Sequence, residues 1–279
     1  IVIPDGVTSI GKEAFEDCYS LTSIVIPDGV RSIGSRAFQS CYSLTSIVIP
    51  DRVTSIGDGA FDGCSLLKQK PTQEIEMSNF KYRLLMHNHL AMVLGYSGRS
   101  ATINIPSEIN HEGVIYRVTN IVDSAFKGCS SLTSIVIPES VTSIGDCAFE
   151  DCSSLTSIVI PDGVTSIGDC AFDGCSSLTS MVVAEGNTVY DSREQCNAII
   201  HTATNTLIRG CQNTIIPDGV TSIEGEAFKD CSSLTSIVIP DGVTSIGESA
   251  FNECHSLTSI VIPDSVTSIG GWAFDGCSS

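Results

Sequence analysis

The stretch Ser154–Gly168, SLTSIVIPDGVTSIG, returns unchanged at Ser233–Gly247 and with small changes through most of the 279-residue chain. Two dipeptides, Ile-Pro and Ala-Phe, recur with it, and inside each block of copies the step is 23 residues. In the blocks of copies Ile-Pro lies at 3–4, 26–27, 49–50, 137–138, 160–161, 216–217, 239–240 and 262–263. A fixed period of this length with an apolar skeleton is typical of a solenoid, in which stacked copies bury one continuous core.

The copy between Cys18 and Cys41 shows what each coil contains. Its motif L-x-x-I-x-I begins at Leu21, and the isoleucines alternate with Ser23 and Val25, which is the pattern of a strand with one buried face. Pro27-Asp28-Gly29 then ends the strand with a turn. The following Ala-Phe pair and the next Cys are three to four residues apart, which predicts one helical turn at most. The Phe is the bulkiest residue of the copy, so we expect it to fill the wide end of the coil.

These observations predict an α/β-class solenoid of about ten to eleven 23-residue coils. We expect each coil to place its L-x-x-I-x-I strand on one face, with short strands and helical turns on the other. The whole chain, 1–279, is expected to form a single array with repeat blocks at 1–66, 120–184 and 214–279. Two irregular inserts rich in β-hairpins, 67–119 and 185–213, separate these blocks. Because the chain begins and ends inside a repeat, we expect it to be a piece of a longer array.

The consensus C-x-x-L-x-x-I-x-I-P-x-x-V-x-x-I-x-x-x-A-F resembles the Treponema pallidum-type leucine-rich repeat of BspA-like surface proteins. The motif is long and recurs over most of the chain, so the resemblance is specific. It implies a leucine-rich-repeat solenoid whose L-x-x-I-x-I strands form a parallel sheet. It also implies a microbial cell-surface or secreted, hence extracellular, protein that mediates adhesion to host, matrix or other cells through protein–protein interaction.

Composition excludes several classes of partner. The net charge is −18 with 14 Lys plus Arg, so the chain lacks the basic surface that nucleic acids or anionic lipids require. No apolar run approaches the roughly 20 residues of a membrane span, so we expect no membrane insertion in this segment. No nucleophile, phosphate-loop or metalloprotease motif occurs, and we expect no enzymatic activity and no cofactor.

Thirteen cysteines raise the question of disulfides and metals. Nine of them occupy one repeat position, and no C-x-x-C spacing occurs. In a parallel stack these side chains point the same way, so we expect buried thiols that act as small apolar fillers. Cys196 and Cys211 differ, because a hairpin turning at Ala203-Thr204 would place them opposite each other. Whether that pair is bonded or unbonded remains open from the sequence.

Two other groups of residues invite a metal hypothesis, and we expect neither to bind one. An aspartate recurs at the Pro-Asp turn, but the clustered acids of a dedicated calcium loop are absent, which favours a solvated turn. His87 and His89 lie two residues apart without a nearby third ligand. The aspartate column comprises Asp5, Asp28, Asp51, Asp162, Asp218, Asp241 and Asp264.

The insert 67–119 is a candidate partner-binding patch. It contains six of the fourteen Lys and Arg against four acids, with three of the five His and three of the six Tyr. A cationic, aromatic island on an acidic chain would orient an acidic partner. A plain structural insertion explains the same composition. The candidate residues are Tyr82, Arg83, His87, His89, Tyr96, Arg99, Tyr116 and Arg117.

The outward positions of the repeated strand scarcely vary, which suggests a second binding surface. Such a uniform face suits an extended macromolecular ligand, bound through many weak contacts, better than a small molecule. The alternative is a structural stalk or a self-associating spacer without a specific ligand. The candidate stripe comprises Ser134, Val136, Ser157, Val159, Ser236, Val238, Ser259 and Val261.

Overall fold

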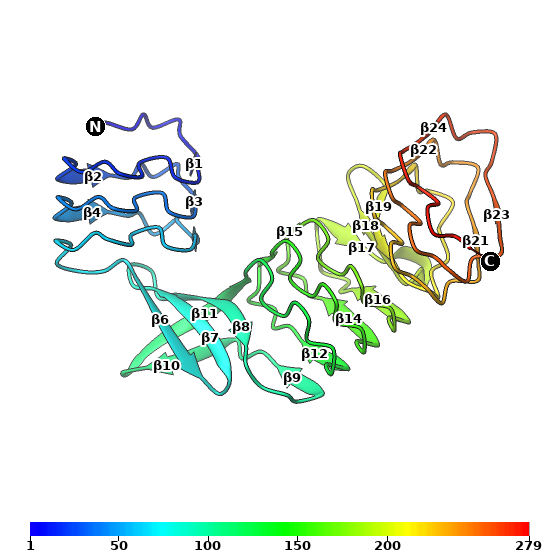
Figure 1. Cartoon of the computed structure of the whole chain (residues 1–279), viewed down its shortest axis with the longest axis horizontal. Coiled ribbons are helices and arrows are strands. Elements are labelled where there is room, and N and C mark those ends of the chain that lie inside the picture. The colour runs from blue at the N-terminus through cyan, green and yellow to red at the C-terminus, as the bar shows by residue number, and fades with distance from the viewer. Residues whose placement is uncertain (279) are drawn as a thin grey trace. The chain divides into compact units, whose positions relative to one another are not determined.

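The computed structural model describes residues 1–278, which divide into two compact units. The first unit contains Ile1–Val93 and Glu108–Asn120, and the second contains Leu94–Ser107 and the chain from Ile121 onward. Figure 1 colours these parts from blue at the N-terminus to red at the C-terminus. The single uninterrupted array expected from the sequence stays a prediction.

The first unit combines stacked repeat coils with an antiparallel insert. Its coils carry the parallel sheets β1–β3–β5 and β2–β4, and its insert carries the strand order β6–β7–β8–β11 with β10 beside β11. The strands are β1 (Ser9–Ile10), β2 (Ser23–Val25), β3 (Ser32–Ile33), β4 (Ser46–Val48), β5 (Ser55–Ile56), β6 (Thr72–Met77), β7 (Phe80–Leu85), β8 (Leu90–Tyr96), β10 (Glu108–His111) and β11 (Val114–Ile121).

The second unit repeats this plan with a shorter insert. Its sheets run β16–β14–β12–β9, β13–β15, β17–β18–β19–β20–β22–β24 and β21–β23. The strands are β9 (Thr102–Asn104), β12 (Ser134–Val136), β13 (Ser143–Ile144), β14 (Ser157–Ile160), β15 (Ser166–Ile167), β16 (Ser180–Val183), β17 (Tyr190–Asp191), β18 (Ala198–His201), β19 (Thr206–Gly210), β20 (Ser222–Ile223), β21 (Ser236–Val238), β22 (Ser245–Ile246), β23 (Ser259–Val261) and β24 (Ser268–Ile269).

The register of the strands confirms the solenoid. Ser9 pairs with Ser32, and Ser32 pairs with Ser55, so each repeat position lies beside its own copy 23 residues later. The inward isoleucines are buried as the alternation predicted; Ile24, for example, is 3% exposed. In Figure 1 the coils of the first block form a regular stack, with β2 and β4 on one side and β1 and β3 on the other.

The predicted phenylalanine column fills the interior. Neighbouring rings stack with centroids 4.9 to 5.5 Å apart and planes within 5° of parallel. Phe149 lies between Phe126 and Phe172 and is fully buried. Stacked aromatic rings bury large apolar areas, so this column supplies much of the contact between coils.

The cysteine column also takes the predicted role. All thirteen cysteines are free. The Cys41 thiol donates a hydrogen bond to the Phe15 carbonyl at 3.1 Å, and Cys64 bonds Phe38 in the same way. Burial raises the pKa of Cys41 to about 11. These thiols are therefore neutral fillers with weak donor capacity. The aspartates of the Pro-Asp turns are exposed, as expected.

The predicted helical turns, and with them the α/β class, are wrong. In the described residues the sole helix is a three-residue 3-10 turn at Arg193–Gln195. Around the phenylalanines, successive main-chain N–H groups alternate between a carbonyl of the same coil and a carbonyl of the next coil. Ala37 N–H bonds Gly34 carbonyl, whereas Phe38 N–H bonds Ala60 carbonyl in the next coil at 2.8 Å. An α-helix sends every N–H to the residue four positions back, so it cannot supply these bonds between coils.

The predicted placement of Cys196 directly opposite Cys211 is wrong, and the question whether the two are bonded, which the sequence left open, is answered by two free thiols. The β18–β19 hairpin forms, with His201 opposite Thr206 as the expected turn requires. A bulge between Ile199 and Ile200 then shifts the register by one residue. Both cysteines remain free and are directed to main-chain oxygens: Cys196 Sγ to Ala198 and Cys211 Sγ to Asn197. A two-residue turn fixes only the near end of a hairpin, and the bulge changes the far end.

Candidate functional site

The predicted Ser/Val stripe lies on the outside of the parallel sheets. Val136 is 57% exposed and Val159 is 53% exposed, while the isoleucines between the stripe positions point inward. Val238 and Val261 are 79% and 71% exposed and lie side by side in register. Val182 extends the row beyond Val159. The accompanying serines, Ser134, Ser157, Ser236 and Ser259, are partly or fully exposed.

Three of the eight residues predicted in the insert patch are buried. Tyr82 is 1% exposed, and burial raises its pKa to about 12. Tyr116 is 2% exposed, with its hydroxyl 3.5 Å from the Met86 sulfur. Arg83 is 5% exposed. The prediction of a surface patch is therefore wrong for these three. Tyr82 and Arg83 are neighbours on β7 and point to opposite sides of the strand, and the adjoining elements cover both sides.

The other five predicted residues differ in environment. His87 is partly buried and contacts the Val53 carbonyl through Nε2 at 3.1 Å. His89 and Arg117 are exposed on the first unit. Tyr96, partly buried, and Arg99, exposed, belong to the second unit. His87 and His89 therefore have separate surroundings, since the His89 ring packs edge-on against Tyr116 at 5.7 Å.

Where the first repeat block ends, side chains of the insert donate hydrogen bonds to some of the acceptors on the exposed edge of the last coil. Asn88 donates to the Val53 carbonyl at 2.8 Å and to the Asp51 carbonyl at 3.1 Å. The Arg83 guanidinium donates to the Ile56 carbonyl at 3.0 Å and to the Asp58 carboxylate at 2.6 Å. The Arg83 bond to the Ile56 carbonyl replaces one that a further coil would make, as the Gly57 N–H does to the Ile33 carbonyl.

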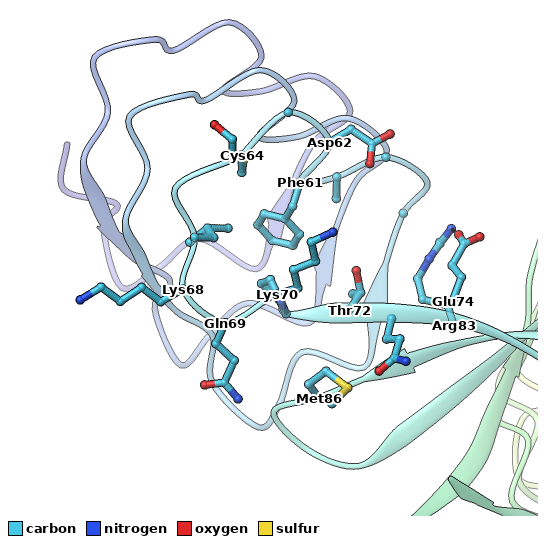
Figure 2. A pocket seen from close by; sticks show the side chains of 18 residues that line it. Phe61, Asp62, Cys64, Lys68, Gln69, Lys70, Thr72, Glu74, Arg83 and Met86 are labelled. Atoms are coloured by element: carbon cyan, nitrogen blue, oxygen red, sulfur yellow. Dashed lines mark hydrogen bonds and ion pairs between the residues drawn. The ribbon is translucent and has the colours of Figure 1, made fainter. Parts of the chain in front are cut away.

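The rest of this edge opens into a cavity of about 870 Å³, which we call the first gap. Figure 2 shows it between the coil that carries Phe61 and the start of β6 at Thr72, with Lys70 extending toward Phe61. Its lining includes Lys68, Lys70 and Arg83 against Asp62 and Glu74, so cations outnumber acids.

Where the second repeat block ends, an arginine lies inside a different cavity of about 580 Å³, the second gap. Arg209, 7% exposed, bonds the Phe172 carbonyl at 2.9 Å and the carboxylate of buried Asp173 at 2.7 Å. It also bonds the carbonyls of Glu226 and Lys229. Its fork of donors therefore joins the last coil of the second block to the first coil of the third.

Charge pairing dominates the second gap. Burial opposes the positive charge of Arg209, but neighbouring groups, among them the Asp173 carboxylate, raise the pKa of this guanidinium. Burial likewise opposes the charge of Lys229, yet its hydrogen bond to Asp173 raises that pKa. Five acids line this cavity against the single arginine: Asp169, Asp173, Glu224, Glu226 and Glu248.

A metal-ligand geometry arises in the same place. Donor atoms of Cys170, Asp173 and Glu226 lie within 4.8 Å of one another. The carboxylates are already paired, Asp173 with Arg209 and Lys229, and Glu226 with Lys229 at 3.2 Å. Burial, together with the hydrogen bond to Glu226, raises the pKa of the Cys170 thiol. A metal ion would therefore have to displace two cations and a proton. The expectation of no metal stays a prediction.

Comparison with known families identifies the repeats. The family described as BspA type leucine rich repeat region matches residues 1–90, 102–209 and 208–279 in six copies. The chain therefore belongs to this family, and it forms a solenoid of about 11 turns. Proteins of this repeat family are typically non-enzymatic. None of the curated proteins compared with the chain matches it. No helix in the described residues is long and apolar enough to cross a membrane.

Three solved structures are similar to this chain. A leucine rich cell surface protein from Faecalibacterium prausnitzii is 32% identical, with 97% of this chain and 69% of that chain covered at a TM-score of 0.53. The leucine rich repeat protein of T. pallidum is 28% identical over 74% of this chain and 90% of that one, with a TM-score of 0.48. A leucine-rich repeat protein from Eubacterium ventriosum is 24% identical over 99% and 82%, with a TM-score of 0.47.

The sequence reasoning missed both gaps. Arg209 was available as a signal, because a single arginine interrupts the apolar strand Leu207-Ile-Arg-Gly210. Lys68 and Lys70 entered the charge count of the insert but were not proposed as site residues. A gap forms where a coil is missing, and a missing coil has no motif of its own.

Proposed function

We propose that this chain is an extracellular, cell-surface or secreted binding module of a microbe that adheres to proteins of a host, its matrix or other cells. The exposed valine row carries the proposal. Contiguous apolar side chains on an outer face, rimmed by serine hydroxyls, are the usual feature of a contact surface. Membership of the BspA type family and similarity to a leucine rich cell surface protein of F. prausnitzii support the location.

The mode of binding follows from the repetition. Val136, Val159 and Val182 belong to consecutive strands of one sheet, so the same shallow contact is offered at each step along the row. Each such contact is weak, and many contacts to an extended partner add through effective concentration. No singular constellation of nucleophile and base is needed for this activity. The alternative is a self-associating spacer, in which the same valines contact other copies.

A binding assay distinguishes the two functions. The double variant Val136→Glu/Val159→Glu should lower binding to immobilised matrix proteins about tenfold, since charge on an apolar contact is costly to desolvate. The matched control, Ser130→Glu/Ser153→Glu, adds the same charge to the same coils at exposed positions off the strands and should bind like the parent. Absence of binding to every surface, combined with concentration-dependent light scattering that the valine variant abolishes, would establish the spacer instead.

A further inference from the structure

The first gap exposes a row of main-chain donors that every preceding coil uses. In the second coil, the N–H groups of Arg36, Phe38 and Ser40 donate to carbonyls of the third coil at 2.7 to 2.8 Å. The first coil makes the equivalent three bonds to the second. The donors occupy alternate residues and point along the stacking direction.

In the third coil the equivalent donors are Gly59, Phe61 and Gly63. No further coil follows, and the described residues provide no hydrogen-bond acceptor for these three N–H groups. All three residues line the first gap. The insert caps the neighbouring part of this edge through Arg83 and Asn88 but leaves these donors facing the cavity.

Side chains that would shield the donors are missing as well. Positions 59 and 63 have φ of +61° and +78°, and the same left-handed geometry recurs in the other coils. In those coils the two equivalent positions carry residues with side chains, for example Glu13 and Asp17, or Glu226 and Asp230. Among the nine Ala-Phe coils, the third alone has glycine at both positions. The open edge is therefore unshielded.

Charge around this edge favours an acidic ligand. Lys68 and Lys70 line the cavity, are exposed, and form no ion pair with the described residues. Arg83, by contrast, is already paired with Asp58 and Glu74. Three donors on alternate residues are spaced too widely for one small anion to accept all three. They match the main-chain carbonyls of a polypeptide that takes the place of the next coil.

We propose that the first gap binds an acidic peptide segment of a protein partner. Its carbonyls accept hydrogen bonds from the Gly59, Phe61 and Gly63 N–H groups, and its carboxylates pair with Lys68 and Lys70. This mode of binding goes beyond the proposed adhesion through the valine row and uses none of those residues. The second gap is unsuited to the same ligand, because its five acids would repel it.

The test uses the whole chain, labelled with ¹⁵N at glycine and phenylalanine. The probe is a pool of capped hexapeptides made of Glu, Thr and Val, with a Lys, Thr and Val pool and sodium sulfate as comparisons. The acidic pool should shift the amide protons of Gly59, Phe61 and Gly63 downfield in a saturable way, and the affinity should fall with added salt. Failure of the acidic pool to shift these signals, or an equal response to the basic pool, would overturn the proposal. Equal shifts with sulfate alone would reduce the site to one for simple anions and would also overturn it.

Two variants locate the interaction. Lys68→Glu/Lys70→Glu should weaken binding about tenfold or more through charge reversal. Gly59→Glu should block the donors, and glutamate is already accommodated at the equivalent positions 13 and 226. Its matched control is Ser249→Glu, which introduces glutamate at the same repeat position of another coil, where the Ser249 N–H already donates to the Gly271 carbonyl. Unchanged binding in the two test variants would place the peptide elsewhere. The valine-row variant should bind the peptide normally, so failure of one proposal is distinguishable from failure of the other.

Discussion

The two gaps solve one problem in opposite ways. The first and the second repeat block each end where an insert replaces the next coil, and in both cases a hairpin strand places one buried arginine at the exposed edge of the last coil. Arg83 on β7 pairs with Asp58, which is 81% exposed, and with half-exposed Glu74. Arg209 on β19 pairs with Asp173, which is 6% exposed. At both gaps the main-chain donors of the last coil lack an acceptor among the described residues, but a buried ion-pair network fills the second gap, whereas the first remains a cationic cavity.

The difference teaches how a solenoid tolerates interruption. Breaking the repeat leaves backbone donors and acceptors without partners, and each must be satisfied or left open to solvent or a ligand. In the second gap Arg209 bonds carbonyls on both sides, which holds the flanking coils together. In the first gap Arg83 bonds the main chain of one coil only, at the Ile56 carbonyl. A closed gap serves stability, and an open one is available for binding.

The largest expected effect is at Arg209. Replacing it with Met should lower the free energy of unfolding by about 3–5 kcal/mol, because Asp173 and three carbonyl groups lose a buried charged partner. Urea denaturation followed by circular dichroism measures the change. Arg209→Lys keeps the positive charge but not the several N–H donors of the planar guanidinium, so its loss of unfolding free energy should be intermediate. An unfolding midpoint unaltered by Arg209→Met would show that the network does not stabilise the second gap.

A smaller effect is expected at Arg83. Arg83→Met should cost about 1–2 kcal/mol, since its acidic partners can return to water and only the Ile56 carbonyl loses a buried donor. The same denaturation experiment, run beside the Arg209 variant, tests the comparison directly. Equal losses for the two methionine variants would contradict the distinction between a closed and an open gap.

The smallest effect is the pH dependence at Glu74. Partial burial raises the pKa of this carboxyl, but hydrogen bonds from Lys81 and Arg83 outweigh it and lower the pKa below its ordinary value. A depressed folded-state pKa stabilises the protein above the unfolded-state value, and that stabilisation is lost as pH falls through the folded-state pKa. Glu74→Gln should therefore lower the unfolding midpoint slightly at pH 6.

As the pH falls through the folded-state pKa of Glu74, the same variant should come to match the parent, because Glu74 is then protonated in both the folded and the unfolded state. Measuring the parent and Glu74→Gln side by side along a series of decreasing pH cancels the contribution of every other carboxyl. A difference that stays constant over the whole acid range would mean that Glu74 acts through packing and not through its charge.

The repeated part of the chain was predictable because each coil meets its own copy. Once the 23-residue step is known, the parallel register, the buried isoleucines, the phenylalanine stack and the free thiols follow from one motif. The local backbone was harder. The Ala-Phe segment has helical spacing, yet its alternate N–H groups bond the adjacent coil, and no local pattern contains that information.

The inserts were predictable only as strands. The sequence predicted hairpins in this insert, but it could not show that Tyr82 and Arg83, on opposite sides of β7, would both be buried. The hairpin of β18 and β19 was expected, and the bulge that separates Cys196 from Cys211 was not. These outcomes depend on which elements cover the insert, and that is decided by packing and not by period.

The sequence by itself therefore determined the stacking, since a strict repeat places identical side chains at identical positions and makes the interior a consequence of one motif. Only the tertiary structure decided what happens where the repeat stops. Arg83 contacts Asp58 across 25 residues and Arg209 contacts Asp173 across 36, with no periodicity to relate either pair. Whether an edge is closed or open depends on such distant contacts, because a main-chain donor has no preferred partner until the fold brings one near it.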